Sequence, residues 1–260
     1  GATLGPIQAH EGFTNAEKAA RKALELDSQL GEAHRVIGHI NRSYHHDWVG
    51  AAEEFEIAFE LDPANTDILV AKGRLEQDLG HFDKAIENLR RAVSLDPISP
   101  GKYVTLGRGY YFAGQLEGAV SCYKKALELQ PERPIVHALL GMAHIRQNRI
   151  EDALLEFNLE QEERWHQFGF ALAFHAKGEK EAASRALTEL IAKYSNEMAY
   201  QIAEAYAYQE NKTGAFEWLD RAFQQNDAGM TSMKFDYFLQ YLHSDPRWKS
   251  LLKKMKFPED

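Results

Sequence analysis

A short phrase recurs four times in the first half of this 260-residue sequence, and no other feature constrains the fold as strongly. The phrase reads ALELD, FELDP, SLDP and ELQP, and its equivalent positions are Asp27, Asp62, Asp96 and Gln130. Each position follows the previous one by about 34 residues, with one extra residue in the first interval. Such a period is typical of a unit in which two helices are joined by a turn.

The residues between the phrases indicate two helices in each unit. Apolar residues recur at the spacing of one helix face, as Ala85, Leu89 and Ala92 in one unit and as Ala119, Tyr123 and Ala126 in the next. Glycine precedes each such face by twelve residues, where a side chain would hold two helices apart, at Gly73, Gly107 and Gly141. Proline lacks a backbone donor and ends the second helix, at Pro63, Pro97 and Pro131. We therefore predict an all-α array of helix pairs.

One unit carries a complete family motif. Residues 100–133 resemble the tetratricopeptide repeat family through Tyr103, Leu106, Gly107, Tyr110, Ala119, Tyr123, Ala126 and Pro131. The neighbouring units match less fully. Glu76 replaces an aromatic residue in unit 66–99, one extra residue lies within SYHHDW of unit 32–65, and unit 134–161 has no closing proline. The resemblance implies a right-handed superhelical solenoid with a long concave surface.

We predict three parts along the chain. Residues 1–14 form an N-terminal lead, in part a possible remnant of cloning, because a start at Gly1 is expected for a segment of a longer protein. Residues 15–227 form an array of about six repeats, the first with only its second helix. One helix over about 15–27 precedes helix pairs that span about 31–61, 65–95, 99–129, 133–163, 165–193 and 197–225. Residues 228–260 form a helical cap.

The predicted cap is rich in aromatic residues, which are Phe235, Tyr237, Phe238, Tyr241, Trp248 and Phe257. A repeat array needs its terminal helix pair covered to stay in solution, so we interpret these residues as the apolar side of a cap over that pair. A dimer interface is the alternative interpretation of the same residues.

Composition and charge exclude several classes of function. The chain carries 39 acidic and 30 basic residues, for a net charge of −9, whereas phosphate contacts need clustered Lys and Arg. We therefore expect no nucleic-acid binding by this segment. No apolar run is long enough to span a bilayer, and no signal-peptide pattern is present. We expect a cytoplasmic location, or a periplasmic one if the parent chain is anchored in a membrane.

No residue cluster in the sequence indicates catalysis. His45, His46 and Asp47 are zinc-ligand types with His39 upstream. Adjacent histidines point in different directions, however, so we interpret them as turn residues. GRGYYFAG lacks the glycine spacing of a phosphate loop, and no strand precedes it. The one cysteine, Cys122, has no cationic cluster nearby and is expected to be inert. We predict no enzymatic activity, no cofactor and no metal.

The family's geometry implies that the second, fifth, ninth and twelfth positions of each first helix face the concave groove. They hold Asp67, Val70, Arg74 and Gln77 in one unit, Gly101, Val104, Arg108 and Tyr111 in the next, and Ile135, Ala138, Met142 and Ile145 in the third. The residues that we assign to peptide binding are Val70, Arg74, Gln77, Val104, Arg108, Tyr111, Ala138, Met142 and Ile145. An apolar surface with two arginines suits an extended or helical peptide that carries a carboxylate.

Two observations limit this assignment. Arginine is mostly exposed in proteins, so solvated surface positions are the alternative interpretation of Arg74 and Arg108. The two residues also do not complete the asparagine-containing carboxylate clamp of family members that bind chaperone tails. We therefore disfavour chaperone tails as the partner.

The last third of the chain carries a narrower resemblance. AYQIAEAYAYQENKTGAFEWLDRAF and FDYFLQYLHSDPRWKSLLKKMKFP are similar to the C-terminal repeat region of bacterial multidomain regulators. In that group the repeats follow a winged-helix, class III adenylate cyclase, protein kinase or TolB-like segment. The resemblance implies a non-enzymatic regulatory module that binds a protein or peptide partner, or another part of its parent chain. The alternative is a small-ligand or signal-peptide sensor with a pocket formed by Tyr110, Tyr111 and Arg108. The sequence leaves the oligomeric state open.

Overall fold

Helices make up the part of the chain that the structure describes. The computed structural model describes residues 6–259 and contains, within them, fourteen α-helices, one π-helical turn and two 3₁₀ segments. Their bounds are α1 (Pro6–Leu26), α2 (Gly31–Ile40), η1 (Asn41–His45), α3 (Trp48–Leu61), α4 (Thr66–Asp78), α5 (Phe82–Leu95), α6 (Pro100–Phe112), α7 (Leu116–Leu129), α8 (Val136–Arg146), α9 (Ile150–Leu159), α10 (Glu163–Lys177), α11 (Lys180–Tyr194), α12 (Ala199–Tyr208), α13 (Lys212–Gln224), η2 (Ala228–Phe235), η3 (Tyr237–Leu242) and α14 (Pro246–Lys254). The predicted all-α class is confirmed.

Each first helix packs closely on its second helix at the glycine that the repeat pattern singled out. A Cβ on Gly107 of α6 would lie 2.5 Å from the Tyr123 ring of α7, and one on Gly141 of α8 would lie 2.5 Å from the Phe157 ring of α9. Real side chains do not approach this closely, so glycine is required where the aromatic ring crosses. Tyr123 and Phe157 are fully buried and belong to one continuous apolar core.

The extra residue of the unit 32–65 is accommodated by a change of helix type. The end of α2 continues into the π-helical turn η1, which widens the helix by one residue. His46 then adopts a left-handed backbone with φ of 50°. The Asp47 side chain accepts a hydrogen bond from the backbone N–H of Gly50 and so caps α3. His45 lies 3.1 Å from Glu17 of α1. His45, His46 and Asp47 therefore form the turn between α2 and α3 and pack it against its neighbours.

Two predicted helix boundaries are wrong. The first helix was expected from about residue 15 but begins at Pro6, so part of the predicted lead 1–14 is helical; residues 1–5 lie outside the described range. The fourth helix pair ends at Leu159 rather than near residue 163. Glu160 then turns inward and accepts hydrogen bonds from the backbone N–H groups of Ile135 and Ala138 at the start of α8. The Glu160 carboxylate thus caps the first turn of α8, in place of a side chain at the N-cap position of that helix.

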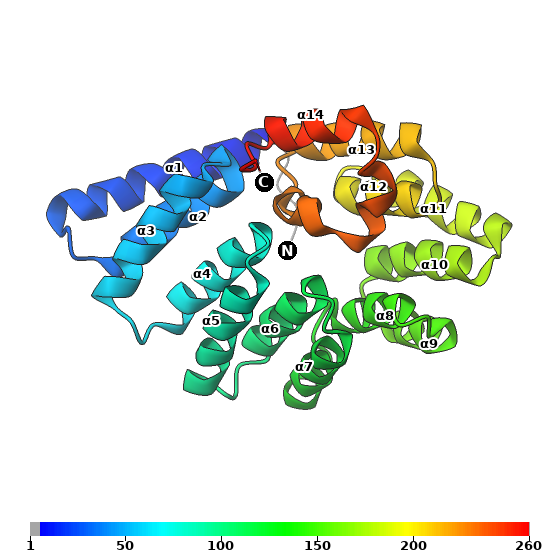
Figure 1. The fold of residues 1–260 in the computed structure, drawn as a ribbon, viewed down its shortest axis with the longest axis horizontal. Coiled ribbons are helices and arrows are strands. Elements are labelled where there is room, and N and C mark those ends of the chain that lie inside the picture. The colour runs from blue at the N-terminus through cyan, green and yellow to red at the C-terminus, as the bar shows by residue number, and fades with distance from the viewer. Residues whose placement is uncertain (1–5, 260) are drawn as a thin grey trace.

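The stacked pairs form a ring whose two ends meet (Figure 1). The Trp48 indole N–H of α3 donates a hydrogen bond to the backbone oxygen of Met255 over 3.0 Å. The Trp48 ring also stacks on Phe257 at 4.6 Å, and the Lys256 ammonium donates to the His45 backbone oxygen. The C-terminal segment therefore closes the array onto its first complete helix pair.

The C-terminal aromatic residues cover more than the last helix pair. Trp248 and Leu251 of α14 pack in the same apolar cluster as Leu219 of α13, as a cap would. Phe235 instead meets the Phe82 ring of α5 at 5.3 Å, and Phe257 reaches α3. The expectation of a cap over the last pair alone is thus too narrow. The segments η2 and η3 lie on the inner side of the ring (Figure 1), in contact with α4 and α12. Within residues 6–259, no helix has the length and apolar character needed to cross a membrane.

Candidate functional site on the concave side

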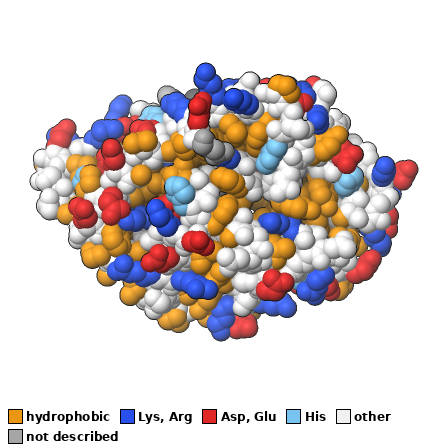
Figure 2. All heavy atoms as spheres, in the orientation of Figure 1, with side chains coloured by type: hydrophobic (Ala, Val, Ile, Leu, Met, Phe, Trp, Pro, Cys, Tyr) orange, Lys and Arg blue, Asp and Glu red, His pale blue; other side chains and the backbone are white. Residues whose placement is uncertain are grey.

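A cavity of about 330 Å³ lies inside the ring between the concave helices and η2. Its lining residues are Arg74, Arg108, Tyr111, Phe112, Tyr123, Ile135, Leu139, Met142, Arg164, Trp165, Glu197, Met198, Tyr200, Gln201, Glu204, Asp227, Ala228, Gly229, Ser232 and Asp236. On the face seen in Figure 2, hydrophobic and basic side chains surround a hollow near the middle. The ring thus keeps an internal space of small-ligand size.

Two arginines from successive repeats line one wall of this cavity. Arg74 of α4 and Arg108 of α6 are half-buried, and no hydrogen bond or ion pair joins either guanidinium to another residue of the range 6–259. The charge of Arg42, then burial and the charge of Arg108, lower the pKa of Arg74 to about 9. Arginine is a cation at neutral pH, so neither of these two side chains has a counterion among the described residues.

The first complete repeat adds basic groups that the sequence reasoning missed. One unit before Val70, Arg74 and Gln77, the equivalent positions hold Arg35, His39 and Arg42, which belong to α2 and η1. With Arg74 they line a second cavity of about 190 Å³. Burial, followed by the nearby arginine charges, lowers the pKa of His39 to about 4. The sequence could have identified these three residues, because they lie one repeat before the groove positions of unit 66–99 when the first interval, one residue longer than the others, is used.

Arg42 anchors the C-terminal segment to the wall. Its Nε lies 2.7 Å from the Asp78 carboxylate, and both side chains are buried. The same guanidinium donates to the Thr231 hydroxyl over 3.2 Å, and the Ser232 hydroxyl donates to Asp78 over 3.0 Å. The segment η2 is thereby fixed to α4 by a buried network of four side chains.

Acidic groups line the opposite side of the cavity. Burial and the neighbouring charge of Asp236 raise the pKa of Glu204 in α12 well above its usual value. Burial also raises the pKa of Asp236, whose carboxyl accepts hydrogen bonds from the Tyr200 hydroxyl and the Phe238 N–H over 2.9 Å each. The two carboxyls are neighbours, so a charge on one disfavours ionisation of the other. Glu197, by contrast, is neutralised by Arg164 over 2.8 Å.

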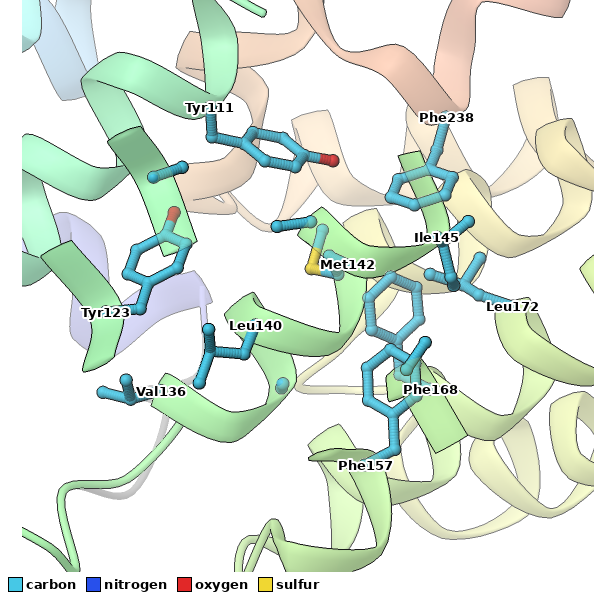
Figure 3. Close-up of a cluster of buried hydrophobic side chains, with 14 of the residues drawn as sticks. Tyr111, Tyr123, Val136, Leu140, Met142, Ile145, Phe157, Phe168, Leu172 and Phe238 are labelled. Atoms are coloured by element: carbon cyan, nitrogen blue, oxygen red, sulfur yellow. The ribbon is translucent and has the colours of Figure 1, made fainter. Parts of the chain in front are cut away.

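Two phenol groups at the cavity lack hydrogen-bond partners. The hydroxyls of Tyr111 and Tyr123 are buried, and no residue of the described range bonds to them. Burial raises the pKa of both phenols, so they stay protonated. Figure 3 shows both rings at one end of the buried cluster that also contains Met142. Buried hydroxyls are normally bonded, so these two are available to a polar group inside the cavity.

The nine residues assigned to peptide binding do not form one surface. Those that line the 330 Å³ cavity are Arg74, Arg108, Tyr111 and Met142. Val70 lines the second cavity, and Val104 packs half-buried against the core. Gln77, Ala138 and Ile145 are buried in helix packing. Tyr110, named for the ligand pocket, is turned away from the cavity, and its hydroxyl accepts a hydrogen bond from Arg90 Nε.

The remaining sequence candidates are not brought together as a chemical centre. Among the described residues, no group of three or more histidine, cysteine or acidic side chains is placed to hold a metal ion. Cys122 is buried, and burial raises the pKa of its thiol to about 11. The glycines of GRGYYFAG lie within α6 and at its end, where they serve packing and the turn.

The comparisons with known proteins agree with the repeat architecture. The families described as "Tetratricopeptide repeat" and "TPR repeat" match residues 66–99 and 107–148. No curated protein sequence matches the chain.

Several solved structures resemble this chain in fold, and one of them is a TPR protein by its description. A thermophilic TPR protein of Thermus thermophilus, TTC0263, has 18% identity and a TM-score of 0.58 over 67% of this chain and 98% of its own. Pseudomonas aeruginosa pilF has 20% identity and a TM-score of 0.57 over 80% and 96% of the two chains. Cut9 of the APC/C hetero-tetramer Cut9–Hcn1 has 16% identity and a TM-score of 0.64 over 96% of this chain and 48% of its own. Residues 66–99 and 107–148 are therefore tetratricopeptide repeats within a solenoid of the same kind.

Proposed function

We propose that this chain is a non-enzymatic interaction module whose concave cavity binds a carboxylate carried by a partner. Arg74 and Arg108 support the proposal most directly, because they occupy equivalent positions of successive repeats, line one cavity and have no counterion within residues 6–259. Guanidinium groups bind carboxylates through paired hydrogen bonds. Tetratricopeptide repeat arrays are protein-binding scaffolds, and the similar protein Cut9 was solved in a hetero-tetramer with Hcn1.

The size and position of the cavity determine which part of a partner would enter it. The segments η2 and η3 already cover part of the concave side. A volume of about 330 Å³ is at the small end of the roughly 300–1,000 Å³ typical of ligand pockets. We therefore propose that a chain end or another short carboxylate group binds there, rather than a long segment along the whole groove.

The proposal includes the biological setting that the C-terminal resemblance implies. The array would be the partner-binding region of a larger bacterial signalling or transcription regulator, and occupation of the cavity would alter an attached output domain. The closed ring supports this idea physically, because the two ends of the array are joined through Trp48, Met255 and Phe257. A ligand that contacts both the concave helices and η2 would change the packing at that junction.

A small-ligand sensor is the second candidate function. The unpartnered hydroxyls of Tyr111 and Tyr123 favour it, since a partner's chain end would need to bring polar groups deep into the ring to reach them. Both candidates use the same arginines. They differ in whether the occupant belongs to a macromolecule.

The test is selective capture by the immobilised chain. The probe is a pool of random hexapeptides with a free C-terminal carboxylate, compared with the same pool as C-terminal amides and read by mass spectrometry. We expect enrichment from the acid pool only. Hydrogen bonds to charged groups contribute roughly 1.5–3 kcal/mol when desolvated, so Arg108→Ala should weaken an enriched peptide about tenfold or more in calorimetry. Arg74→Ala should have a similar or smaller effect.

Arg185 of α11 is an exposed arginine outside the cavity and provides the matched control. Arg185→Ala should bind like the unchanged chain. Equal enrichment of acids and amides, or undiminished affinity in the Arg74→Ala/Arg108→Ala double variant, would place partner binding elsewhere.

A further inference from the structure

Basic side chains line one side of the 330 Å³ cavity, and acidic side chains line the other. Arg74 and Arg108 line it from α4 and α6. Glu204 lines it from α12, and Asp227 and Asp236 line it from the ends of η2. The two sides therefore come from helices more than ninety residues apart in the sequence, and only the closed ring makes them face each other.

The two walls interact electrostatically without touching. The charge of Arg108 lowers the pKa of Glu204 against the larger effect of burial, so the two groups sense each other across the cavity. No ion pair within 4.0 Å connects Arg74 or Arg108 to an acid in residues 6–259. Charges in a partly buried site attract more strongly than in water, yet this attraction is not satisfied by protein contacts.

The acidic wall offers oxygen acceptors to a positive group. Glu204 and Asp236 are both buried and adjacent, and burial raises the pKa of each carboxyl, as it does for Asp227. Asp227 is fixed by hydrogen bonds from the N–H groups of Gly229 and Tyr200. A primary ammonium has three N–H donors and can bond to several such oxygens at once.

The rest of the lining is mixed, with polar groups from Tyr111, Tyr123, Tyr200, Gln201, Ser232 and the Arg164–Glu197 ion pair. Phe112, Leu139, Met142 and Trp165 supply an apolar surface. The hydroxyls of Tyr111 and Tyr123 can each donate to or accept from a ligand's polar group, and Tyr111 and Tyr123 are 5% and 0% exposed. An occupant of this cavity therefore has charged ends, an apolar side chain and at least one polar group between them.

We infer that the cavity binds a short zwitterion, a free amino acid or dipeptide with an apolar side chain. Its carboxylate lies between Arg74 and Arg108, its ammonium faces Glu204, Asp227 and Asp236, and its side chain contacts Met142. This inference rests on the carboxylate site proposed above and adds the second charge and the small size of the ligand. Of the two candidate functions above, it favours the small-ligand sensor.

The experiment is titration calorimetry of the full chain with named probes. They are free L-leucine, L-methionine and L-phenylalanine and the dipeptides Leu-Leu, Leu-Met and Phe-Leu, each unblocked, N-acetylated and C-amidated. We expect at least one unblocked probe to bind, and either blocking group to weaken it about tenfold or more, as for loss of a charged hydrogen bond. Glu204→Gln should weaken the unblocked probe and leave the N-acetylated one unchanged.

A second variant protects the test against loss of folding. Tyr111→Phe removes a hydroxyl that has no partner in the part of the chain that the structure describes, so it should melt at the temperature of the unchanged chain while binding the probe about five-fold more weakly. Arg185→Ala is again the control for a distant surface change.

The blocked probes separate this inference from the proposed function. Equal binding of the unblocked and N-acetylated forms, with loss on amidation, would overturn the zwitterion and leave the carboxylate site standing. Equal binding of all three forms would overturn both. Absence of binding by every probe at millimolar concentration would also overturn the inference, while capture from the hexapeptide acid pool would still support the carboxylate site.

Discussion

Replacement of Arg42 by alanine should destabilise the ring where η2 is anchored. Arg42 and Asp78 are 3% and 1% exposed, so the variant leaves a carboxylate buried with the Ser232 hydroxyl as its one remaining side-chain partner among the described residues. Removing one partner of a buried ion pair costs about 3–5 kcal/mol. Arg74 remains close enough for its charge to lower the pKa of Asp78, which places the expected loss near the lower figure.

A loss of this size is readily measured. For a chain of this length, about 3–5 kcal/mol corresponds to a decrease in Tm of about 6–20 °C. Urea unfolding should show a lower midpoint, and hydrogen exchange should become faster in residues 228–242, which lose the bond from Arg42 to Thr231. Arg185→Ala should stay within about 0.5 kcal/mol of the unchanged chain.

The pH dependence of the Arg42→Ala deficit identifies its cause. Burial raises the pKa of Asp78, so the folded state binds this proton more tightly than the unfolded state, and stability falls as the pH rises from the unfolded value to the folded one. Loss of Arg42 raises the folded pKa further. The deficit should therefore be larger at about pH 8 than at about pH 5.

The charge argument also predicts the effect of a double substitution. Arg42→Met with Asp78→Leu removes both charges and should be more stable than Arg42→Ala alone. A deficit that is independent of pH, or a double variant as unstable as the single one, would show that packing rather than the unpaired carboxylate determines the loss. A single variant within about 1 kcal/mol of the unchanged chain at pH 8 would refute the reasoning altogether.

Three further changes have expected outcomes. Deletion of residues 231–257 should uncover Trp218 and the fully buried Leu219, and we expect the shortened chain to aggregate in size-exclusion chromatography. A monomer with unchanged Tm would contradict the capping role. Sedimentation of the intact chain tests the alternative that these residues form a dimer interface. Gly107→Ala places a Cβ 2.5 Å from the Tyr123 ring and should cost about 1–3 kcal/mol in urea unfolding, while Gly12→Ala, which meets nothing within 4 Å, should be neutral or stabilising. Burial raises the pKa of the Cys122 thiol to about 11, so iodoacetamide should modify it slowly at neutral pH until urea unfolds the chain; rapid labelling of the folded protein would mean that the thiol is accessible.

The repeated part of the fold could be predicted because its determinants are local and periodic. The phrase around Asp62 and Asp96, the glycines and the facing aromatic rings recur once in each repeat, and each contact joins a helix to its partner or to the next pair. Such contacts lie within one or two repeats, so a one-dimensional pattern is enough to specify them. The same pattern assigned Arg74 and Arg108 to one concave surface, and both line the same cavity. It did not extend to Arg35, His39 and Arg42, because the extra residue of η1 lengthens the interval of the first unit by one.

The closure of the ring was decided by tertiary structure alone. Trp48 bonds to Met255, Arg42 to Thr231 and Asp78 to Ser232, and no repeat interval links these positions. Small rotations between successive pairs add up along the array and determine whether its two ends meet. The acidic wall of Glu204 and Asp236 reaches the arginines only through that accumulated curvature. The sequence therefore specified the helix pairs and their stacking, whereas the cavity with a basic and an acidic wall exists because distant segments meet in space.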